Sequence, residues 1–227
     1  MCQWLSGLTL YRLDGTVRAM RRPSTKSATP AQVTRDELLR ATVRVVAEEG
    51  LPRLTLDAVA RAAGVSKGGL LYHFPTKEAL IRALIETFIA EWDRAMAREY
   101  ARDPEPEKPG RWLRAYVRAS FAEVDPNESL TLGLGQGDLA SFLAALAVNP
   151  ELLGLIQTAY DRWHRLLVSD GVDEVTATAV RFAADGIYFA EGFGLAPPVG
   201  RQRQQVCDLI LAWSAAPGRT GTEMAGA

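Results

Sequence analysis

The segment TLDAVARAAGVSKGGLLYHFPTKEAL, which starts at Thr55, constrains the fold more than any other part of this chain. Thr55, Ser66 and Thr76 are residue types that cap helix N-termini, and each precedes a run that can form a helix. Gly64 and Pro75 end the two intervening helices, because glycine favours the conformation that closes a helix and proline cannot continue one. Two short helices joined by such a tight turn are typical of a helix-turn-helix motif.

A further helix precedes this motif. Thr34 and Glu37 fit a capping box, in which each side chain accepts a hydrogen bond from the other residue's backbone amide. The apolar residues that follow share one face at helical spacing, and the pattern ends at Gly50: Leu38, Leu39, Val45 and Val46. We predict that this helix braces the motif and that residues 33–78 form a three-helix domain.

Gly68 and Gly69 lie in the first turn of the second motif helix, although a glycine costs a helix interior about 1 kcal/mol relative to alanine. In a helix-turn-helix the N-terminal residues of this helix contact base edges in the major groove. Missing side chains would let the helix backbone approach the DNA closely. The residues expected to hold this helix to its domain are Leu70, Leu71 and Phe74.

Polar groups surround the two glycines. Ser66 and Lys67 offer a hydroxyl and a positive charge for a phosphate or for guanine N7 and O6. Tyr72 and His73 project from the other side with donors for phosphate oxygens, and Lys77 can pair with another phosphate. The alternative is an ordinary helix hairpin with a solvated tyrosine and histidine. The candidate DNA-binding residues are Thr55, Ser66, Lys67, Gly68, Gly69, Tyr72, His73 and Lys77.

The charge of the chain is asymmetric, although its total is only -1. Residues 1–75 carry a net charge of +5, and the remainder therefore carries -6. A basic N-terminal part on an acidic body suggests a polyanionic partner for the first part alone. Chance clustering explains the charge pattern equally well when it is considered by itself.

Residues 33–80 resemble the DNA-binding domain of the TetR family of bacterial transcription regulators. The resemblance rests on Thr55 to Gly64, followed by Val65, Tyr72, Phe74, Lys77 and Leu80. It implies a homodimer in which the helix from Ser66 to Phe74 reads a palindromic operator. It also implies that the remaining helices form a ligand-binding and dimerisation domain.

The rest of the chain predicts further helices and no strand, so the fold class is all-α. A long helix follows Thr76, and three prolines end it in the charged loop from Arg102 to Gly110. The other predicted helices span 111–124, 138–148, 150–168, 173–195 and 201–213, with an irregular Gly-rich connection at 125–138. We divide the chain into a disordered basic arm (1–32), the helix-turn-helix domain (33–78), the ligand-binding and dimerisation domain (79–214) and a disordered tail (215–227). Translation could start at Met1 or at Met20.

The predicted helix 173–195 is apolar on more than one face, and such a helix is usually buried on both sides. One face would meet its own domain and the other a partner chain, with a second stripe supplied by the last helix. The alternative is a central helix of a monomeric bundle. The candidate dimer-interface residues are Val175, Phe182, Phe189, Phe193, Val206, Leu209, Ile210 and Trp213.

Small-molecule sites are lined mainly by apolar and aromatic side chains with a few polar groups. The candidate ligand-binding residues are Trp92, Trp112, Tyr116, Phe121, Tyr160, Trp163 and His164. For any single aromatic residue, a place in the ordinary core is the competing interpretation. His164 with Asp161 is a weak metal signal, because a zinc site needs three or four protein ligands.

Several functional classes are not supported by the sequence. It contains no spanning apolar run, no nucleophile or phosphate-loop motif, and only Cys2 and Cys207, which fits a reducing cytosol. We therefore expect a cytoplasmic, non-enzymatic regulator without cofactor, metal or membrane partner. Its expected partners are a double-stranded DNA operator, a second copy of the chain and a small effector that releases a repressor from DNA. The alternatives are an activator or ligand-independent regulator, and an all-α small-molecule-binding protein without DNA affinity.

Overall fold

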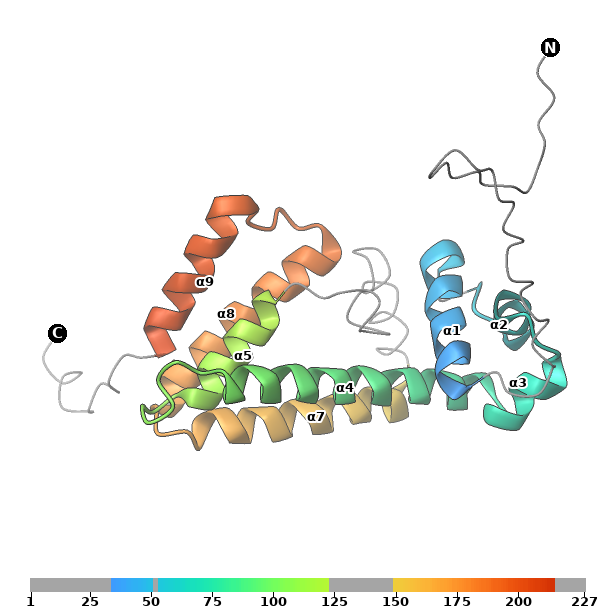
Figure 1. Ribbon diagram of the computed structural model, residues 1–227, viewed down its shortest axis with the longest axis horizontal. Helices are drawn as coiled ribbons and strands as arrows, with labels where there is room; N and C mark the ends of the chain where they lie inside the picture. Colours follow the sequence, from blue (N-terminus) through green and yellow to red (C-terminus); the bar gives the residue numbers. More distant parts are fainter. Residues whose placement is uncertain (1–33, 51–52, 123–148, 215–227) are drawn as a thin grey trace, which may run out of the picture. The chain divides into compact units, whose positions relative to one another are not determined.

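The computed structural model describes residues 34–50, 53–122 and 149–214, and within them it contains eight α-helices and no strand. Three of them form the N-terminal group: α1 (Arg35–Glu49), α2 (Leu56–Ala63) and α3 (Lys67–His73). The others are α4 (Lys77–Ala101), α5 (Arg111–Phe121), α7 (Pro150–Val168), α8 (Glu174–Phe193) and α9 (Gly200–Ser214) (Figure 1). The all-α prediction is confirmed for these residues.

The predicted capping residues mark where the N-terminal helices begin and end. Thr34 and Glu37 form both hydrogen bonds of the capping box at the start of α1. The Thr55 hydroxyl accepts a hydrogen bond from the Ala58 amide, and the Ser66 hydroxyl accepts one from the Gly69 amide; the donor–acceptor distance is 3.1 Å in both. Gly64 ends α2 in the left-handed conformation, with φ of 69°. The turn between α2 and α3 is therefore fixed from both sides.

The three helices enclose a small apolar core. Leu39, Val59 and Leu70 come from α1, α2 and α3, and all three are fully buried. Arg44 of α1 donates a hydrogen bond of 3.0 Å to the carbonyl of Ala62, at the end of α2. Phe74 is buried as predicted, whereas Leu71 is only partly buried and contributes less to holding α3 than we expected.

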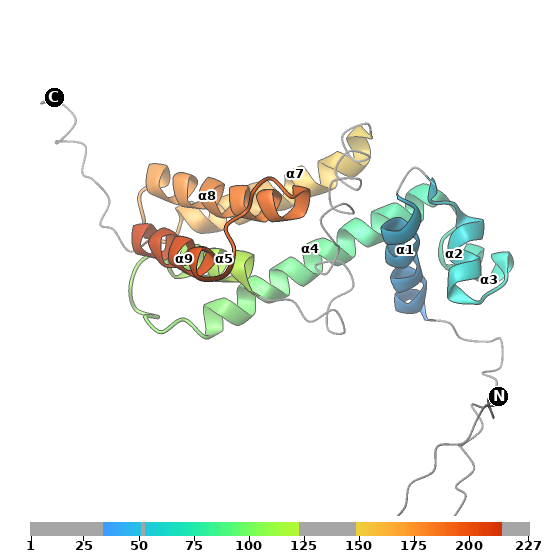
Figure 2. The same ribbon diagram turned by 90° about the horizontal axis from the view of Figure 1, so that it is seen from above.

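The second helical group is built around α4. This helix packs against α5 and α7, and α8 packs against α5, α7 and α9. Figures 1 and 2 both show α8 running beside α5. The predicted boundary between residues 33–78 and 79–214 falls in the first turn of α4, which is continuous across it. The division into two domains remains a prediction.

The connection between α4 and α5 is held by buried charge. Asp103 accepts hydrogen bonds from Arg114 Nε over 2.9 Å and from Arg118 over 3.1 Å, and Arg114 also donates to the carbonyls of Glu105 and Pro109. Burial alone would raise the pKa of Asp103, but these hydrogen bonds and that of the Glu105 amide outweigh it and hold the pKa below its usual value.

Gly110 begins α5 at a crowded corner. Its φ is +83°, and its amide donates a hydrogen bond of 2.8 Å to the carbonyl of Asp170. The Asp170 carboxylate then accepts the next free amides of α5, those of Trp112 and Leu113, and so caps α5 from the turn after α7. A Cβ atom at Gly110 would lie 2.8 Å from the Ser214 carbonyl oxygen.

Most predicted helix limits agree with the structure. The helix expected at 150–168 is found at those residues, and those expected at 173–195 and 201–213 differ from α8 and α9 by one or two residues at an end. The arm 1–32, the connection 125–138, the helix 138–148 and the tail 215–227 lie outside the described residues. So does the end of the helix predicted for 111–124.

Candidate functional site

The first turn of α3 presents backbone rather than side chain. Gly68 and Gly69 are both exposed, and neither has a positive φ. A Cβ atom added at either residue would meet nothing closer than the Ser66 hydroxyl oxygen, at 4.0 Å and 3.4 Å respectively. Nothing inside the described protein therefore requires a glycine at either position. Their small size matters for whatever approaches from outside.

Polar side chains lie around this turn. Tyr72 is 86% exposed, and its ring meets that of His73 edge-on at 5.2 Å between centroids. Lys67 is exposed and pairs with Asp57 of α2 over 3.1 Å, so it is not a free cation as the sequence suggested. An exposed pair of this kind contributes little to stability and can be exchanged for a phosphate.

The ends of the flanking helices complete this surface. Thr55 and Ser66 are exposed, but their hydroxyls already accept the capping hydrogen bonds, so each could offer DNA only its proton or a remaining lone pair. Lys77 is the first residue of α4 and is half-buried. All eight predicted DNA-binding residues thus lie on α3 or at the helix ends beside it.

A second site lies in the other helical group, where aromatic rings from four helices meet. Trp92 of α4 lies 5.5 Å from Tyr116 of α5, 6.0 Å from Trp163 of α7 and 5.8 Å from Tyr188 of α8, measured between ring centroids. Tyr160 lies 5.1 Å from Trp163. Four of the seven predicted ligand-binding residues are therefore brought together: Trp92, Tyr116, Tyr160 and Trp163.

The structure places the other three predicted ligand-binding residues differently. Trp112 stacks on Tyr100, at 4.1 Å between centroids, near the end of α4. Phe121 lies at the end of α5, and the Arg203 guanidinium carbon is over its ring, 5.1 Å from the ring centroid. His164 has a ring contact with none of the described aromatic residues, and its buried Nδ1 has no hydrogen-bond partner.

Sequence reasoning missed the polar part of this site. Asp185 of α8 is buried; it accepts a hydrogen bond from the Tyr116 hydroxyl and one of 3.0 Å from Arg181. The signal was present, because these two charged residues are spaced by four in the middle of the helix, where their side chains meet. We call the seven residues Trp92, Tyr116, Tyr160, Trp163, Arg181, Asp185 and Tyr188 the polar–aromatic cluster.

Burial is the largest influence on the pKa values of Asp185, Tyr160 and Tyr188 in this cluster. It raises the pKa of Asp185, although the hydrogen bond from Tyr116 and the charge of Arg181 oppose it. Burial and the nearby carboxylate raise the pKa of Tyr160 above its usual range, and burial raises that of Tyr188 to about 12. The tyrosines therefore remain neutral at physiological pH and act as hydrogen-bonding groups.

An exposed apolar stripe runs along α8 and α9. Val175 is 78% exposed and Phe182 is 60% exposed, although both stand on a helix whose opposite side packs into the core. Phe193, Leu209 and Trp213 are also exposed, and Phe189 is half-buried. Among the described residues, these side chains have little apolar cover, and their role in a dimer interface stays a prediction.

Two residues of the predicted interface do not belong to this stripe. Ile210 is only 3% exposed and packs inside the core of its own chain. Val206 is half-buried against the same core. The reason is geometric: α9 turns these two residues towards α5 and α8, so its outer face carries Leu209 and Trp213 instead. Val206 and Ile210, which the sequence placed at the dimer interface, therefore lie against the core of their own chain.

The described residues contain neither a candidate metal site nor a membrane-spanning helix. No group of three or more His, Cys, Asp and Glu side chains is placed to hold a metal ion in residues 34–50, 53–122 and 149–214. In the same part of the chain, no helix is both long and apolar enough to cross a membrane.

A helix-turn-helix group followed by a helical group with a buried polar–aromatic cluster defines a class of DNA-binding regulators, and comparison with known proteins identifies the family. Residues 38–84 match the family described as bacterial regulatory proteins, tetR family, and residues 110–215 match the tetracyclin repressor-like C-terminal domain. The transcriptional regulator BetI of Burkholderia cenocepacia (strain HI2424) is 33% identical over 157 residues, which cover 69% of this chain and 77% of that protein. The chain belongs to the TetR family and is a DNA-binding transcriptional regulator.

Other relatives agree on the family. BetI of Stenotrophomonas maltophilia is 32% identical over 130 residues, which are 57% of this chain and 62% of that protein. The match to UidR of Escherichia coli K12 is shorter, at 37% identity over 70 residues, or 31% of this chain and 34% of that protein.

Solved structures share the fold at lower sequence identity. A transcriptional regulator from Rhodococcus superposes with a TM-score of 0.60 at 23% identity, over 79% of this chain and 95% of that one. A multidrug binding protein, EbrR, in complex with malachite green superposes with a TM-score of 0.59 at 22% identity, over 80% of this chain and 98% of that one.

Proposed function

We propose that this regulator is a repressor that binds a palindromic operator as a homodimer and leaves it when a small molecule binds among the C-terminal helices. One observation carries the proposal: α4 is a single helix from Lys77, beside α3, to Trp92 and beyond. Fifteen residues separate Lys77 from Trp92, which is about 22 Å of helix. A movement imposed at the polar–aromatic cluster is therefore transmitted to the DNA-binding end.

The transmission would work as a population shift. Effector binding favours a tilt of α4, and the tilt moves the two α3 helices of a dimer out of step with successive major grooves. For this to happen, the effector must bind the non-operator state more tightly than the operator-bound state. Contacts between α1 and α4, such as the pair of Arg35 and Glu86 at 3.9 Å, would pass the tilt to the rest of the N-terminal group.

Dimerisation is supported by the apolar stripe on α8 and α9. Isolated exposed apolar residues are normal, but a continuous apolar face on two adjacent helices marks an interaction surface. A two-fold contact suits a palindromic operator, because the symmetry of the protein mirrors that of the DNA. The complex of the neighbour EbrR with malachite green shows that a protein of this fold can bind a small molecule, which supports a ligand-binding role here.

The first experiment selects bound sequences from a random duplex pool and measures affinity for the selected site against salt concentration. We expect an inverted repeat, a protein of twice the chain mass on the DNA, and an affinity that falls steeply with salt. A selected site without two-fold symmetry, or binding by a single chain, would contradict the homodimer.

Two alternatives concern the direction of regulation. An activator or a ligand-independent regulator would show the same DNA binding, so transcription from the selected site in a purified system separates them from a repressor. An all-α protein without DNA affinity is disfavoured by the family match at residues 38–84. We also propose that the protein acts in the cytoplasm and catalyses no reaction.

A further inference from the structure

The polar–aromatic cluster contains buried hydrogen-bond donors that have no partner among the described residues. Trp92 is 5% exposed, and its indole Nε1 has no hydrogen-bond partner among the described residues. Arg181 Nε is also buried and unpartnered, although the same guanidinium bonds Asp185 through another nitrogen. Buried donors are almost always paired in folded proteins, and each exception calls for a reason. A bound ligand is one such reason.

The unsatisfied groups decide what kind of atom they would bind. An indole N–H and a guanidinium N–H can only donate, so a ligand that satisfies them must bring an acceptor such as a carbonyl oxygen. Trp163 needs no acceptor from a ligand, because its Nε1 already donates a hydrogen bond of 2.7 Å to Asp93. The two tryptophans thus share one aromatic cluster and differ in whether their donor is free.

The charges of the cluster decide the charge of the ligand. Asp185 and Arg181 pair over 3.0 Å, and the pair carries no net charge. A cationic ligand would need a carboxylate that Arg181 already neutralises, and an anionic ligand would leave an uncompensated negative charge beside Asp185. Burying an unpaired charge is costly, so the cluster favours a neutral molecule.

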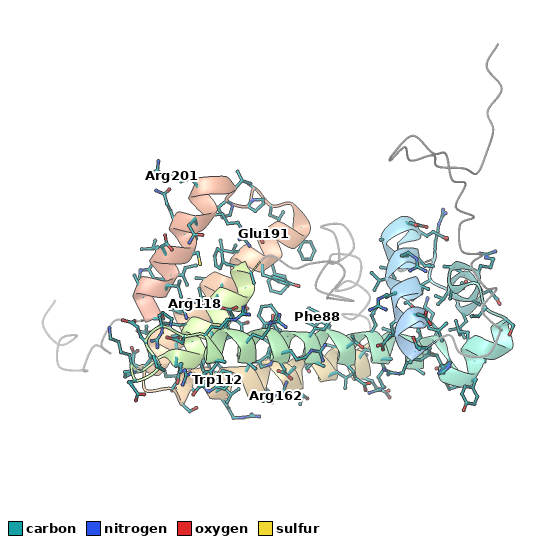
Figure 3. All side chains as sticks on the ribbon, viewed as in Figure 1. Phe88, Trp112, Arg118, Arg162, Glu191 and Arg201 are labelled. Carbon is teal, nitrogen blue, oxygen red and sulfur yellow. The ribbon has the colours of Figure 1, made fainter. Side chains whose placement is uncertain are left out.

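Several apolar side chains beside the cluster are only partly buried in the described residues. Phe88 and Ile89, one turn before Trp92 on α4, are only partly buried, and so are Ile187 and Tyr188, which follow Asp185 on α8. Figure 3 shows Phe88 on α4 and Glu191 further along α8, on the helices that carry Trp92 and Asp185. These half-buried apolar side chains would receive the flat body of a ligand.

We propose that the effector is a neutral, flat, largely apolar molecule with a carbonyl-type acceptor, which Trp92 Nε1 binds inside the polar–aromatic cluster. The inference rests on the proposed function for its role as effector, and on Trp92, Arg181 and Asp185 for its chemistry. Organic cations, which aromatic rings also attract, are the competing class. The pairing of Asp185 with Arg181 argues against them.

Four probes built on one bicyclic skeleton test this class: 1-indanone, indane, indane-1-carboxylate and 1-aminoindane, which is a cation at neutral pH. Their binding to the purified full chain is measured by equilibrium dialysis. Indane leaves water more readily than its ketone, so a preference for 1-indanone requires a donor in the site. We expect 1-indanone to bind about tenfold more tightly than indane, the effect of one hydrogen bond to a buried donor.

Two variants locate that donor. Trp92→Phe keeps a ring and removes Nε1, so the preference for 1-indanone over indane should disappear. Trp163→Phe is the matched control, because its Nε1 is already bonded to Asp93, and the preference should survive. Circular dichroism confirms that both variants are folded. A preference that persists in Trp92→Phe, tighter binding of indane or of either charged probe, or no binding of any probe would overturn the proposal.

Release of the selected operator is scored separately in a duplex shift assay. Ketone-specific binding without release would leave the ligand class standing and contradict ligand-released repression. Operator binding that follows salt as expected, together with a failure of ketone-specific binding, would overturn the ligand class and leave the DNA-binding role intact.

Discussion

At the scale of single residues, the two glycines of α3 show how a locally unfavourable choice can be explained by contacts outside the protein. Each lowers helix stability, and a Cβ at either position would meet nothing closer than the Ser66 hydroxyl, at ordinary contact distance. The helix could therefore carry larger side chains here without internal conflict. We propose the close approach of DNA as the physical reason for glycine at these positions.

Replacement of Gly69 by leucine separates folding from binding. We expect Gly69→Leu to raise the free energy of unfolding by about 0.5–1 kcal/mol, because leucine is the better helix former. It should also weaken operator binding by about 1–3 kcal/mol, the size of one lost base contact. Gly154→Leu, at an open position on α7, is the control and should gain stability alone. Full operator affinity in a folded Gly69→Leu protein would refute close approach.

Lys77 offers a second test at this scale. If Lys77 contacts a phosphate, Lys77→Ala should weaken binding to all duplexes by a similar factor and lower the salt slope by about one unit. Lys108→Ala, in the connection between α4 and α5, removes an equal charge elsewhere and should leave the slope unchanged. An unchanged slope in Lys77→Ala would mean that this residue does not touch DNA.

At the scale of elements, the N-terminal group was predictable almost residue by residue. Its boundaries depend on local signals, namely Thr34 with Glu37, Thr55, Gly64 and Ser66, and each forms the cap its residue type suggests. Short-range hydrogen bonds of this kind can be recognised from spacing alone.

The C-terminal group was predictable in its helices but less so in its sites. Long-range packing decided that Trp112 lies on Tyr100 and that Ile210 faces the core, and no local pattern carries that information. The polar half of the cluster was missed because no local pattern shows that the pair of Arg181 and Asp185 lies inside the helical group. Their burial comes from α4, α5 and α7, which lie far away in the sequence.

The connection between α4 and α5 gives an element-scale prediction. The lowered pKa of Asp103 means that its ionised form stabilises the folded state above the usual aspartate pKa, and that this contribution is lost as pH falls through the lowered value. Asp103→Asn should cost about 3–5 kcal/mol at neutral pH, because it leaves Arg114 buried without its partner. Urea unfolding at neutral and acidic pH measures this, and we expect the loss to shrink at acidic pH. Equal losses at both pH values would show that the charge of Asp103 is not responsible.

At the scale of the whole molecule, the proposed dimer would use exposed apolar residues of α8 and α9 that the folding of one chain does not need. Phe182 is exposed in the single chain, so Phe182→Asp should leave the helical content unchanged. If the stripe joins two copies, the two-fold axis places the new charge twice in the interface, at several kcal/mol for each ion. Light scattering at micromolar concentration should then report monomers, with most operator affinity lost.

Phe182 is a cleaner position for this test than Phe189, which is half-buried and packs against Tyr188 and Phe193. Gln157→Asp on the exposed side of α7 is the matched control and should stay dimeric. A Phe182→Asp protein that remains dimeric and binds its operator would place the interface elsewhere.

The corner at Gly110 ties together α5, the turn after α7 and the end of α9. In Gly110→Ala, a positive φ would be combined with contacts of 2.8 Å from the new Cβ to the Ser214 carbonyl oxygen and 2.9 Å to the Val172 side chain. A strained backbone conformation alone costs about 1–3 kcal/mol, so this variant should lose more than that in its free energy of unfolding. Gly64→Ala is the control, since it has a similar φ of +69° and open space around its Cβ. Thermal unfolding of the two variants separates strain from collision, and equal losses would exclude the collision.

This corner also bears on how such a regulator can diversify. Side chains that meet an effector can be exchanged one at a time, because each exchange alters affinity while the fold persists. Gly110 permits no such gradual change, since the Cβ atom of any other residue type would lie 2.8 Å from the main-chain carbonyl oxygen of Ser214, which no rotamer can move. In a saturation library selected only for folded protein, position 110 should therefore retain glycine almost alone, while Trp92 and Tyr188 accept other large apolar residues. Positions that stay constant in such a library would then be those on which the packing at Gly110 depends, and positions that vary would be those proposed to contact the effector.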